Sequence, residues 1–567
     1  MRKRDIALAL GALTGAAVTA ALKEITQIIS ITKEPPPKVT VPDSDTKAHF
    51  VGGGFASLAG AAYLVRDCEM NGSNITIYEE KHPSADNNPG SFTGGLSSME
   101  EGLLDKKACE NFWELFSSIP SLEAKERSVT EEIFNFNRLH PIKPQARLID
   151  KNGKIQEITG MGFNLADRKA LGKLMIIPED ELDDMTILQW FSDTPHFFET
   201  NFWYIWQTTY SFQKHSSLLE FKRCIERMIF KFPKLDASET AIRTPYNQYE
   251  SILLPLKAYL AEKGVTFIPN ATVTDLDFEN GDGISVTAIH ITMEGQETII
   301  PLAKKDICLM NTDYRFDNTT YGSLREAAPY HSYPSASKEL WEKVAAKKPN
   351  LGNPESFFSH PEVTSAESFT VTCKGNRLLK LIEKYSGNIP GSGELMTFKD
   401  SNWLMSIEIP AQPYFKSQPL ETTVLFGNGL YPDKIGNYVQ KPMKDCTGAE
   451  VLTELIYHLQ MQDKQTEILT DIINVIPCRM PYKNASSKPR KMAERPPVVP
   501  EGSSNFGMVG LFTDIQEDTT ATMEYSVRSA RTAVYSLMGV THKKICPVSP
   551  LIKNPKILAR AFDAAYR

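Results

Sequence analysis

A glycine-rich turn between a predicted strand and a predicted helix constrains the fold of this chain more than any other feature. The strand-like residues 49–51 run directly into the sequence GGGFAS at 52–57, and an apolar helical pattern continues to Val65. In such a turn, glycines permit a tight bend and let the backbone approach a pyrophosphate, which the free N–H groups at the helix start bind. The segment therefore predicts a dinucleotide-binding α/β domain.

A second predicted strand, residues 74–78, ends at Glu79, whose carboxylate can accept the hydroxyls of an adenosine ribose. The alternative is a glycine turn before a buried helix, with Glu79 and Glu80 in solvent. Because further strand signals of this domain are scattered to the far end of the chain, FAD is favoured over NAD. We expect an α/β fold in which a Rossmann-like FAD-binding domain is interleaved with a mixed α+β substrate domain and a helical insertion.

The composition excludes several classes of protein. The 567 residues include 62 basic and 69 acidic ones, for a net charge of −7, so we expect no nucleic-acid partner. The eight cysteines form no C-x-x-C pair and the ten histidines no pair at metal-ligand spacing, so neither a metal site nor a disulfide framework is predicted. The G-x-S-x-G motif of α/β-hydrolases is absent.

The N-terminus carries a basic head, Arg2 to Arg4, before a mostly apolar run of small residues from Ile6 to Leu22. Its length is at the short limit for spanning a bilayer. The run suits an uncleaved membrane anchor, a cleaved or organellar targeting peptide, or a soluble helix. An anchor would associate the protein with a membrane, in a compartment that the sequence leaves open.

Changes in pattern divide the chain into eight segments. They are an N-terminal hydrophobic anchor or signal (1–24), a proline-rich linker (25–47), the FAD-binding domain in three parts (48–104, 236–329 and 471–540), an aromatic-rich helical insertion (105–235), a substrate domain (330–470) and a C-terminal amphipathic tail (541–567). The tail can lie on anionic lipid or dock on the protein as an ordinary helix.

Long collinear segments carry a resemblance to a known family. They include VGGGFASLAGAAYLVRD, FWELFSSIPSLE, NFWYIWQTTYSF, TPYNQYESILLPL, DSNWLMSIEIPAQPYF, GLYPDKIGNYVQKPMKD and RPPVVPEGSSNFGMVGLF. These segments, spread over residues 48–545, resemble the oleate hydratases, flavoproteins once called myosin-cross-reactive antigens. The chain is identified as a divergent member of that family.

The resemblance implies a hydro-lyase that adds water to a double bond of a long-chain unsaturated fatty acid. It also implies bound FAD, a homodimer, and a C-terminal segment that meets the membrane surface. The flavin is not a redox agent here, because adding water to an isolated double bond transfers no electrons overall. Residues matched to cofactor-binding positions are Gly52, Gly54, Phe55, Ser57, Glu79, Val273, Asn311, Gly510 and Phe512.

The two catalytic groups of the family are missing from their usual positions. The family activates water with a carboxylate in an Arg-Gly-Gly-Arg-Glu loop and donates the proton from a tyrosine in an Arg-Arg-Tyr stretch. That loop does not occur here, so Glu101, with Glu100 or Asp105, is the candidate replacement; the alternative is a solvated acidic turn. Cys224, in the sequence KRC, stands at the tyrosine position, either as an acid or as an inert buried thiol.

Three further residues are candidates for the substrate site. Gln248 matches a family glutamine that lines this site, and Asn402 matches a polar position near the fatty-acid carboxylate or the flavin. Tyr246, or its neighbour Tyr249, can take over proton donation, unless this segment is only a hydrogen-bond cluster at a helix start. Hydration, double-bond isomerisation and lipid binding without turnover therefore all remain open.

Overall fold

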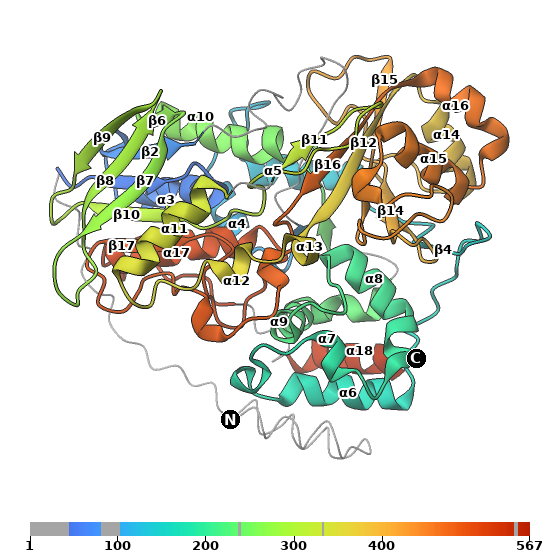
Figure 1. Ribbon diagram of the computed structural model, residues 1–567, viewed down its shortest axis with the longest axis horizontal. Coiled ribbons are helices and arrows are strands. Elements are labelled where there is room, and N and C mark those ends of the chain that lie inside the picture. Colours follow the sequence, from blue (N-terminus) through green and yellow to red (C-terminus); the bar gives the residue numbers. More distant parts are fainter. Residues whose placement is uncertain (1–44, 81–102, 236–239, 332–333, 549–553, 567) are drawn as a thin grey trace.

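The computed structural model describes residues 45–80, 103–235, 240–331, 334–548 and 554–566. Figure 1 shows three parts: a domain built on a parallel sheet, a domain built on a larger sheet, and a helical lobe below them in this view. We call them the parallel-sheet domain, the antiparallel-sheet domain and the helical lobe. The expected α/β architecture, with a Rossmann-like sheet, is confirmed.

Five strands from distant parts of the chain form the parallel sheet, in the order β17-β10-β1-β2-β6. Each neighbouring pair is parallel. Strands β1 and β10 are buried along their whole length, as is usual in a sheet covered on both faces. The strands are β1 (Ala48–Val51), β2 (Ile75–Glu79), β6 (Thr266–Pro269), β10 (Ile307–Asn311) and β17 (Phe506–Val509).

Helices cover one face of this sheet, and a small antiparallel sheet covers the other. Gly60 lets α3 lie directly on β1, because a Cβ there would be 2.7 Å from the ring of Phe50. The first layer contains α3 (Phe55–Asp67), α4 (Glu110–Phe116), α5 (Val129–Leu139), α10 (Leu254–Glu262) and α17 (Glu524–Leu537). The second contains β7 (Thr272–Phe278), β8 (Val286–Met293), β9 (Gln296–Pro301), α11 (Ala336–Lys347) and α12 (Glu355–Phe358).

The second domain contains a seven-stranded sheet in the order β11-β16-β12-β15-β14-β13-β4, whose pairs are antiparallel except β13 with β4. Its strands are β4 (Leu148–Ile149), β11 (Thr320–Tyr321), β12 (Ala366–Lys374), β13 (Met396–Phe398), β14 (Met405–Glu408), β15 (Thr422–Gly429) and β16 (Ile472–Met480). Helices α14 (Arg377–Ser386), α15 (Gly448–His458) and α16 (Gln465–Asp471) cover one face.

The structure distributes several elements differently from the sequence-based division, and three of them illustrate this. Strand β4 falls in the range assigned to the helical insertion and β16 in the range assigned to the FAD-binding domain, yet both lie in the seven-stranded sheet. Helix α11 falls in the substrate range but packs on β7 of the parallel-sheet domain. A local pattern indicates a strand or a helix, but it does not indicate the partner on which that element packs.

The helical lobe consists of α6 (Leu165–Ile176), α7 (Ile187–Trp190), α8 (Asn201–Tyr210) and α9 (Leu218–Met228) around an aromatic core. The C-terminal helix α18 (Pro555–Tyr566) lies against this lobe at the segment Ile229–Lys234. Ala561 of α18 is 3% exposed, and the Arg168 guanidinium lies 4.6 Å from the centre of the Tyr566 ring. Of the two alternatives for the tail, the structure shows the docking helix.

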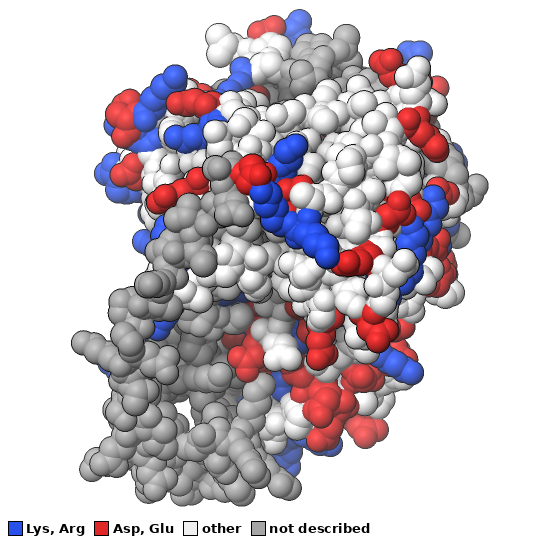
Figure 2. Space-filling view, turned by 90° about the vertical axis from the view of Figure 1, so that its left-hand side faces the viewer, with Lys and Arg blue, Asp and Glu red and all other residues white. Residues whose placement is uncertain are grey.

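Within the described residues, no helix is both long enough and apolar enough to cross a bilayer. The predicted anchor or signal, 1–24, lies outside those residues. Figure 2 shows the face of the molecule at the parallel-sheet domain, where basic and acidic side chains are interspersed. In the coloured part of this view there is no extended basic patch.

Candidate functional site

The glycine turn joins β1 to α3 at the carboxyl edge of the parallel sheet. Gly52 has φ +94°, a left-handed conformation that favours glycine, and its N–H donates to the Tyr78 carbonyl at 3.0 Å. Gly54 is the N-cap of α3 and has no side chain to cap the helix. The first N–H groups of α3 therefore stay available to an anionic group outside the helix.

Two residues at the ends of neighbouring strands face this turn. Asn311 ends β10, and a Cβ at Gly54 would lie 2.5 Å from its Nδ2 atom. Gly510, just after β17, has φ +113°, and a Cβ there would lie 3.1 Å from Asn311 Oδ1. Within the described chain, the buried Ser57 Oγ and Asn311 Oδ1 atoms have no hydrogen-bond partner. A nucleotide bound here could contact the backbone of the glycine turn and form hydrogen bonds with Ser57 Oγ and Asn311 Oδ1.

Glu79 lies beside the same turn at the end of β2. Its carboxylate pairs with the Lys257 ammonium at 2.6 Å, and a Cβ at Gly53 would lie 2.6 Å from Glu79 Cγ. The Glu79 carbonyl accepts the Ala271 N–H at 3.0 Å, which brings Val273 of β7 to this edge. This placement fits the predicted roles of Glu79 at a ribose and Val273 at an adenine.

The side chains of Phe55 and Phe512 belong to the core. Phe55 is 3% exposed and packs on Phe112 and Phe116, whereas Phe512 is fully buried with its ring centre 4.5 Å from that of Phe357. Only the backbone of these two residues is left to approach a cofactor. Their predicted cofactor contact is therefore limited to main-chain atoms.

Two adjoining cavities lie where the three parts of the molecule meet. The larger, of about 240 Å³, is lined by the end of α8, by β12 and β15, and by the segment Thr519–Ala521 before α17. The smaller, of about 130 Å³, is lined by residues that include Arg147, Arg243 and Gln248. Six residues line both: Leu103, Thr209, Leu395, Glu408, Tyr414 and Phe426. The walls of both cavities combine apolar side chains with polar and charged ones.

Three arginines in these walls are paired with carboxylates. Arg243 pairs with Glu408 at 2.8 Å, and Arg147 pairs with Glu394. In the larger cavity, Arg315 pairs with Asp313 at 2.9 Å. Arg315 follows β10 closely and Thr519–Ala521 lie in the connection from β17 to α17, so loops that follow two strands of the parallel sheet line part of the larger cavity.

Glu367 also lines the larger cavity, but strand alternation directs its side chain to the other face of β12. It shares this face with Phe369, whose ring packs in the core beneath α15. Its carboxyl has no hydrogen-bond partner among the described residues, and burial raises the pKa of this group well above its usual range. Glu367 is thus a neutral core acid that borders the cavity with its backbone.

Cys224 lies in the core of the helical lobe and not in either cavity wall. Its side chain is fully buried next to Thr519 and Trp206, and desolvation raises the pKa of the thiol far above its ordinary value. The neighbouring Lys222 Nζ donates to the carbonyls of Leu174 and Ile177, near the end of α6. The sequence KRC therefore has a structural explanation, and of the two alternatives for Cys224 the geometry favours the inert thiol.

The remaining candidates lie in different places. Gln248 is 8% exposed and lines the smaller cavity. Tyr246 is half-buried outside both linings, with the Lys416 ammonium 5.3 Å from its ring centre. Asn402 is exposed, and its Nδ2 donates to the Ile435 carbonyl at 3.0 Å, away from the cavities.

No candidate replacement for the missing carboxylate is among the described residues that line the cavities. Glu100 and Glu101 lie outside the described residues; Leu103, just after them, lines both cavities. Asp105 is buried and already bound, because Thr240 donates to it at 2.7 Å and Lys231 pairs with it at 3.2 Å. No cluster of metal ligands is present in the described part of the chain.

Sequence reasoning missed Tyr210, Glu408 and Tyr414, which all line the larger cavity. Tyr210 reads as part of an aromatic core stripe, and Glu408 as one polar residue of an alternating strand. For Glu408, the alternation of apolar and polar residues along its strand indicates a side chain that faces away from the core. The signal for Tyr210 is its hydroxyl, which an aromatic stripe in a core does not need.

Comparison with known proteins decides the family. A family model described as the MCRA family matches residues 45–535. The chain belongs to the MCRA family. A relative named linoleate hydratase, from Lactiplantibacillus plantarum, is 32% identical over 558 residues, which cover 91% of this chain and 98% of the relative. An oleate hydratase from Streptococcus pyogenes serotype M49 (strain NZ131) is 34% identical over 509 residues, with 87% and 85% covered.

The resemblance to oleate hydratases that the sequence motifs indicate is confirmed by this MCRA membership. Among solved structures, an oxidoreductase from Methanosarcina mazei matches with a TM-score of 0.49 at 12% identity, covering 86% of this chain and 100% of that one. An L-proline dehydrogenase from P. horikoshii matches with a TM-score of 0.35 at 9% identity, covering 92% and 99%.

Proposed function

We propose that this MCRA-family member binds FAD and adds water to a double bond of a long-chain unsaturated fatty acid, which forms a hydroxy fatty acid. The observation that carries the proposal is the pair of adjoining cavities where the three parts of the molecule meet. Walls that combine apolar side chains with several charged groups suit a long hydrocarbon chain with one carboxylate. The two hydratase-named relatives support the same substrate class.

The residues around the glycine turn fit FAD. Gly52 and Gly54 place no side chain of their own at the turn, the uncapped start of α3 offers N–H groups to a pyrophosphate, and Glu79 offers a carboxylate to a ribose. Ser57 Oγ and Asn311 Oδ1 are buried polar atoms with bonds still to make inside the described structure. When bound, FAD would supply a ring system that orders and polarises the site, without net transfer of electrons.

The chain's own residues would hold the substrate. Aromatic and aliphatic side chains, among them Phe212, Leu395 and Phe426, would pack on the hydrocarbon chain. Gln248 in the smaller cavity remains our candidate for a polar contact with the substrate. Homodimer formation and contact with a membrane surface stay predictions from the family resemblance.

The test is incubation of the FAD-loaded protein with oleate and with linoleate in water enriched in ¹⁸O, followed by mass spectrometry. We expect a hydroxy acid that carries the label, and no product from the protein stripped of FAD. A shifted double bond without added oxygen would instead identify an isomerase. Tight binding of the acid with no product would identify a lipid-binding flavoprotein, and either result contradicts the hydratase proposal.

A further inference from the structure

We propose that the Tyr210 hydroxyl is the proton donor of the hydration reaction, supplied from α8 instead of from position 224 on α9. The proposal rests on the proposed function, because it assigns a role in that reaction. It starts from three observations on Tyr210: its place beside Cys224, its unpartnered hydroxyl and its position in the wall of the larger cavity.

Tyr210 and Cys224 are neighbours across two helices. Tyr210 is the last residue of α8, where Ser211 with φ +58° turns the chain towards α9. The Tyr210 ring packs on Trp206 with 4.8 Å between ring centres, and Cys224 lies next to the same Trp206. A phenol on α8 therefore reaches the region from which a tyrosine at 224 would act.

The two side chains differ in their access to the cavity. Cys224 is fully buried and lies outside both cavity walls, whereas Tyr210 lines the larger one. Thr519 separates the two environments, because it lies next to the Cys224 thiol and also lines the larger cavity. Of these two side chains, only that of Tyr210 borders the larger cavity.

The Tyr210 hydroxyl has an unused hydrogen bond. Tyr210 is 7% exposed, and its hydroxyl oxygen has no partner within the residues that the structure describes. A buried hydroxyl without a partner is unfavourable, so such groups commonly serve a ligand or a reaction. The hydroxyl of Tyr431, by contrast, is bound to Gln207 at 3.0 Å.

Surrounding charges suit a donor that gives up its proton only during the reaction. Burial raises the pKa of Tyr210 well above its usual value, and Cys224 and Asp105 act in the same direction, so the phenol stays protonated at neutral pH. Arg147 acts in the opposite direction and favours the phenolate. Arg147 lies in the wall of the smaller cavity, within electrostatic range of Tyr210.

The proposed step consumes only the alkene and one water molecule, and all atoms and electrons are accounted for. The O–H bond of Tyr210 breaks, and the electron pair of the alkene forms a C–H bond with this proton at one carbon. A water oxygen forms a C–O bond at the other carbon, and the proton that this water loses returns to the phenolate, through solvent or a base. One alkene and one water give one alcohol, with no oxidant or reductant.

The test compares Tyr210→Phe with Tyr204→Phe, a matched control on the same helix whose hydroxyl is outside both cavity walls. We expect kcat for oleate to fall about 10²- to 10⁴-fold in Tyr210→Phe, as for loss of a general acid, with oleate affinity and the flavin spectrum unchanged. Its melting temperature should stay equal or rise, because the change removes only an unpartnered oxygen. Tyr204→Phe and Cys224→Ala should keep the wild-type kcat.

A second variant tests whether a phenol on α9 can replace the phenol on α8. In the double variant Tyr210→Phe/Cys224→Tyr, the phenol returns to α9, and we expect part of the lost rate to return. Wild-type kcat in Tyr210→Phe, or a loss of rate in Cys224→Ala alone, would overturn the assignment of Tyr210 and leave the hydratase function standing. Absence of turnover in the wild-type protein would instead refute the proposed function and the inference together.

Discussion

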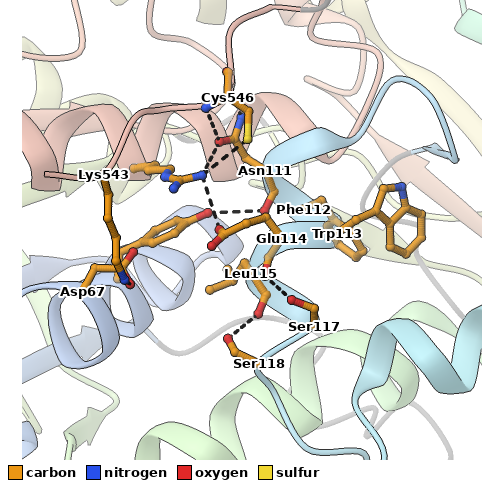
Figure 3. A network of polar contacts seen from close by, with 12 residues as sticks. Asp67, Asn111, Phe112, Trp113, Glu114, Leu115, Ser117, Ser118, Lys543 and Cys546 are labelled. Carbon is orange, nitrogen blue, oxygen red and sulfur yellow. Dashed lines mark hydrogen bonds and ion pairs between the residues drawn. The ribbon is translucent and has the colours of Figure 1, made fainter. Parts of the chain in front are cut away.

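The side-chain amide of Asn111 on α4 and the main chain of Cys546 are joined by two hydrogen bonds (Figure 3). The Cys546 N–H donates to Asn111 Oδ1 at 3.2 Å, and Asn111 Nδ2 donates to the Cys546 carbonyl at 3.4 Å. Arg531 of α17 donates to the same Oδ1 at 2.8 Å. One buried amide thus holds together α4, α17 and the segment that leads to the C-terminal helix.

A second contact holds the same segment to α3. The Lys543 ammonium bonds Asp67 Oδ1 at 2.5 Å, and the Tyr535 hydroxyl donates to Asp67 Oδ2 at 2.7 Å. The Asp67 carboxylate is fully buried, whereas the Lys543 side chain is partly exposed. We call the pair of contacts at Asn111 and Asp67 the C-terminal clasp.

We predict that Asn111→Ala loosens this clasp and destabilises the protein by about 1–3 kcal/mol, because it leaves buried donors and an acceptor without partners. The measurement is the free energy of unfolding in urea, together with the rate of tryptic cleavage after Lys543 and Lys544. Asn152→Ala, at an exposed turn, is the matched control and should change neither. Equal cleavage rates in both variants would show that the clasp does not hold the segment.

A second prediction concerns the glycine turn. Gly54→Ala keeps a backbone conformation that alanine accepts, at φ −66°, but its Cβ would lie 2.5 Å from Asn311 Nδ2. We expect the affinity for FAD to fall at least tenfold, equivalent to about 1.4 kcal/mol, as measured by quenching of flavin fluorescence. Gly172→Ala on α6, where a Cβ meets no atom within 4 Å, is the control. Equal FAD affinity in the two variants would contradict the placement of the cofactor.

The sequence alone predicted the glycine turn well because its chemistry is local. A tight bend, an uncapped helix start and a carboxylate at the next strand end all follow from consecutive residues such as Gly52 and Gly54. The structure places Asn311 beside the same turn, because β10 pairs with β1. The family match had already indicated this residue, which no local pattern could single out.

The substrate site was predicted less well because its walls come from three separate parts of the fold. Whether Tyr210 faces a cavity or the core depends on the packing of α8 against two other parts, which periodicity does not describe. The same limit applies to Cys224, which only the packed helical lobe shows to be enclosed, and to Asn402, which lies on the surface. The family resemblance indicated Cys224 and Asn402, but it did not indicate what surrounds their side chains.

A third prediction tests the docking of α18. Ala561→Glu would bury a carboxylate against the helical lobe, which should cost more than about 2 kcal/mol and release the helix. Faster proteolysis of the C-terminus and a lower melting temperature are the expected results. Ala559→Glu makes the same change two residues earlier on the exposed side of α18 and should leave both unchanged. If both variants behave like the wild type, α18 does not contribute to the stability of the lobe.

The last prediction is a pH dependence that arises from His49 of β1. His49 is 6% exposed, and its Nδ1 atom is 3.0 Å from the Tyr78 hydroxyl. Desolvation lowers the pKa of His49 from its ordinary value of 6.5 to about 4, although Asp306 acts in the opposite direction. Between these two pH values the unfolded chain binds the proton more readily than the folded protein does.

The stability that neutral His49 contributes is therefore complete above about pH 6.5 and is lost as the pH falls towards 4, by up to about 3 kcal/mol. In His49→Gln no proton can bind at this position, so this part of the pH dependence should disappear. Urea unfolding of both proteins across the window gives the difference. A difference that does not change with pH would mean that His49 takes up its proton equally in the folded and unfolded states, in conflict with its burial beside Tyr78.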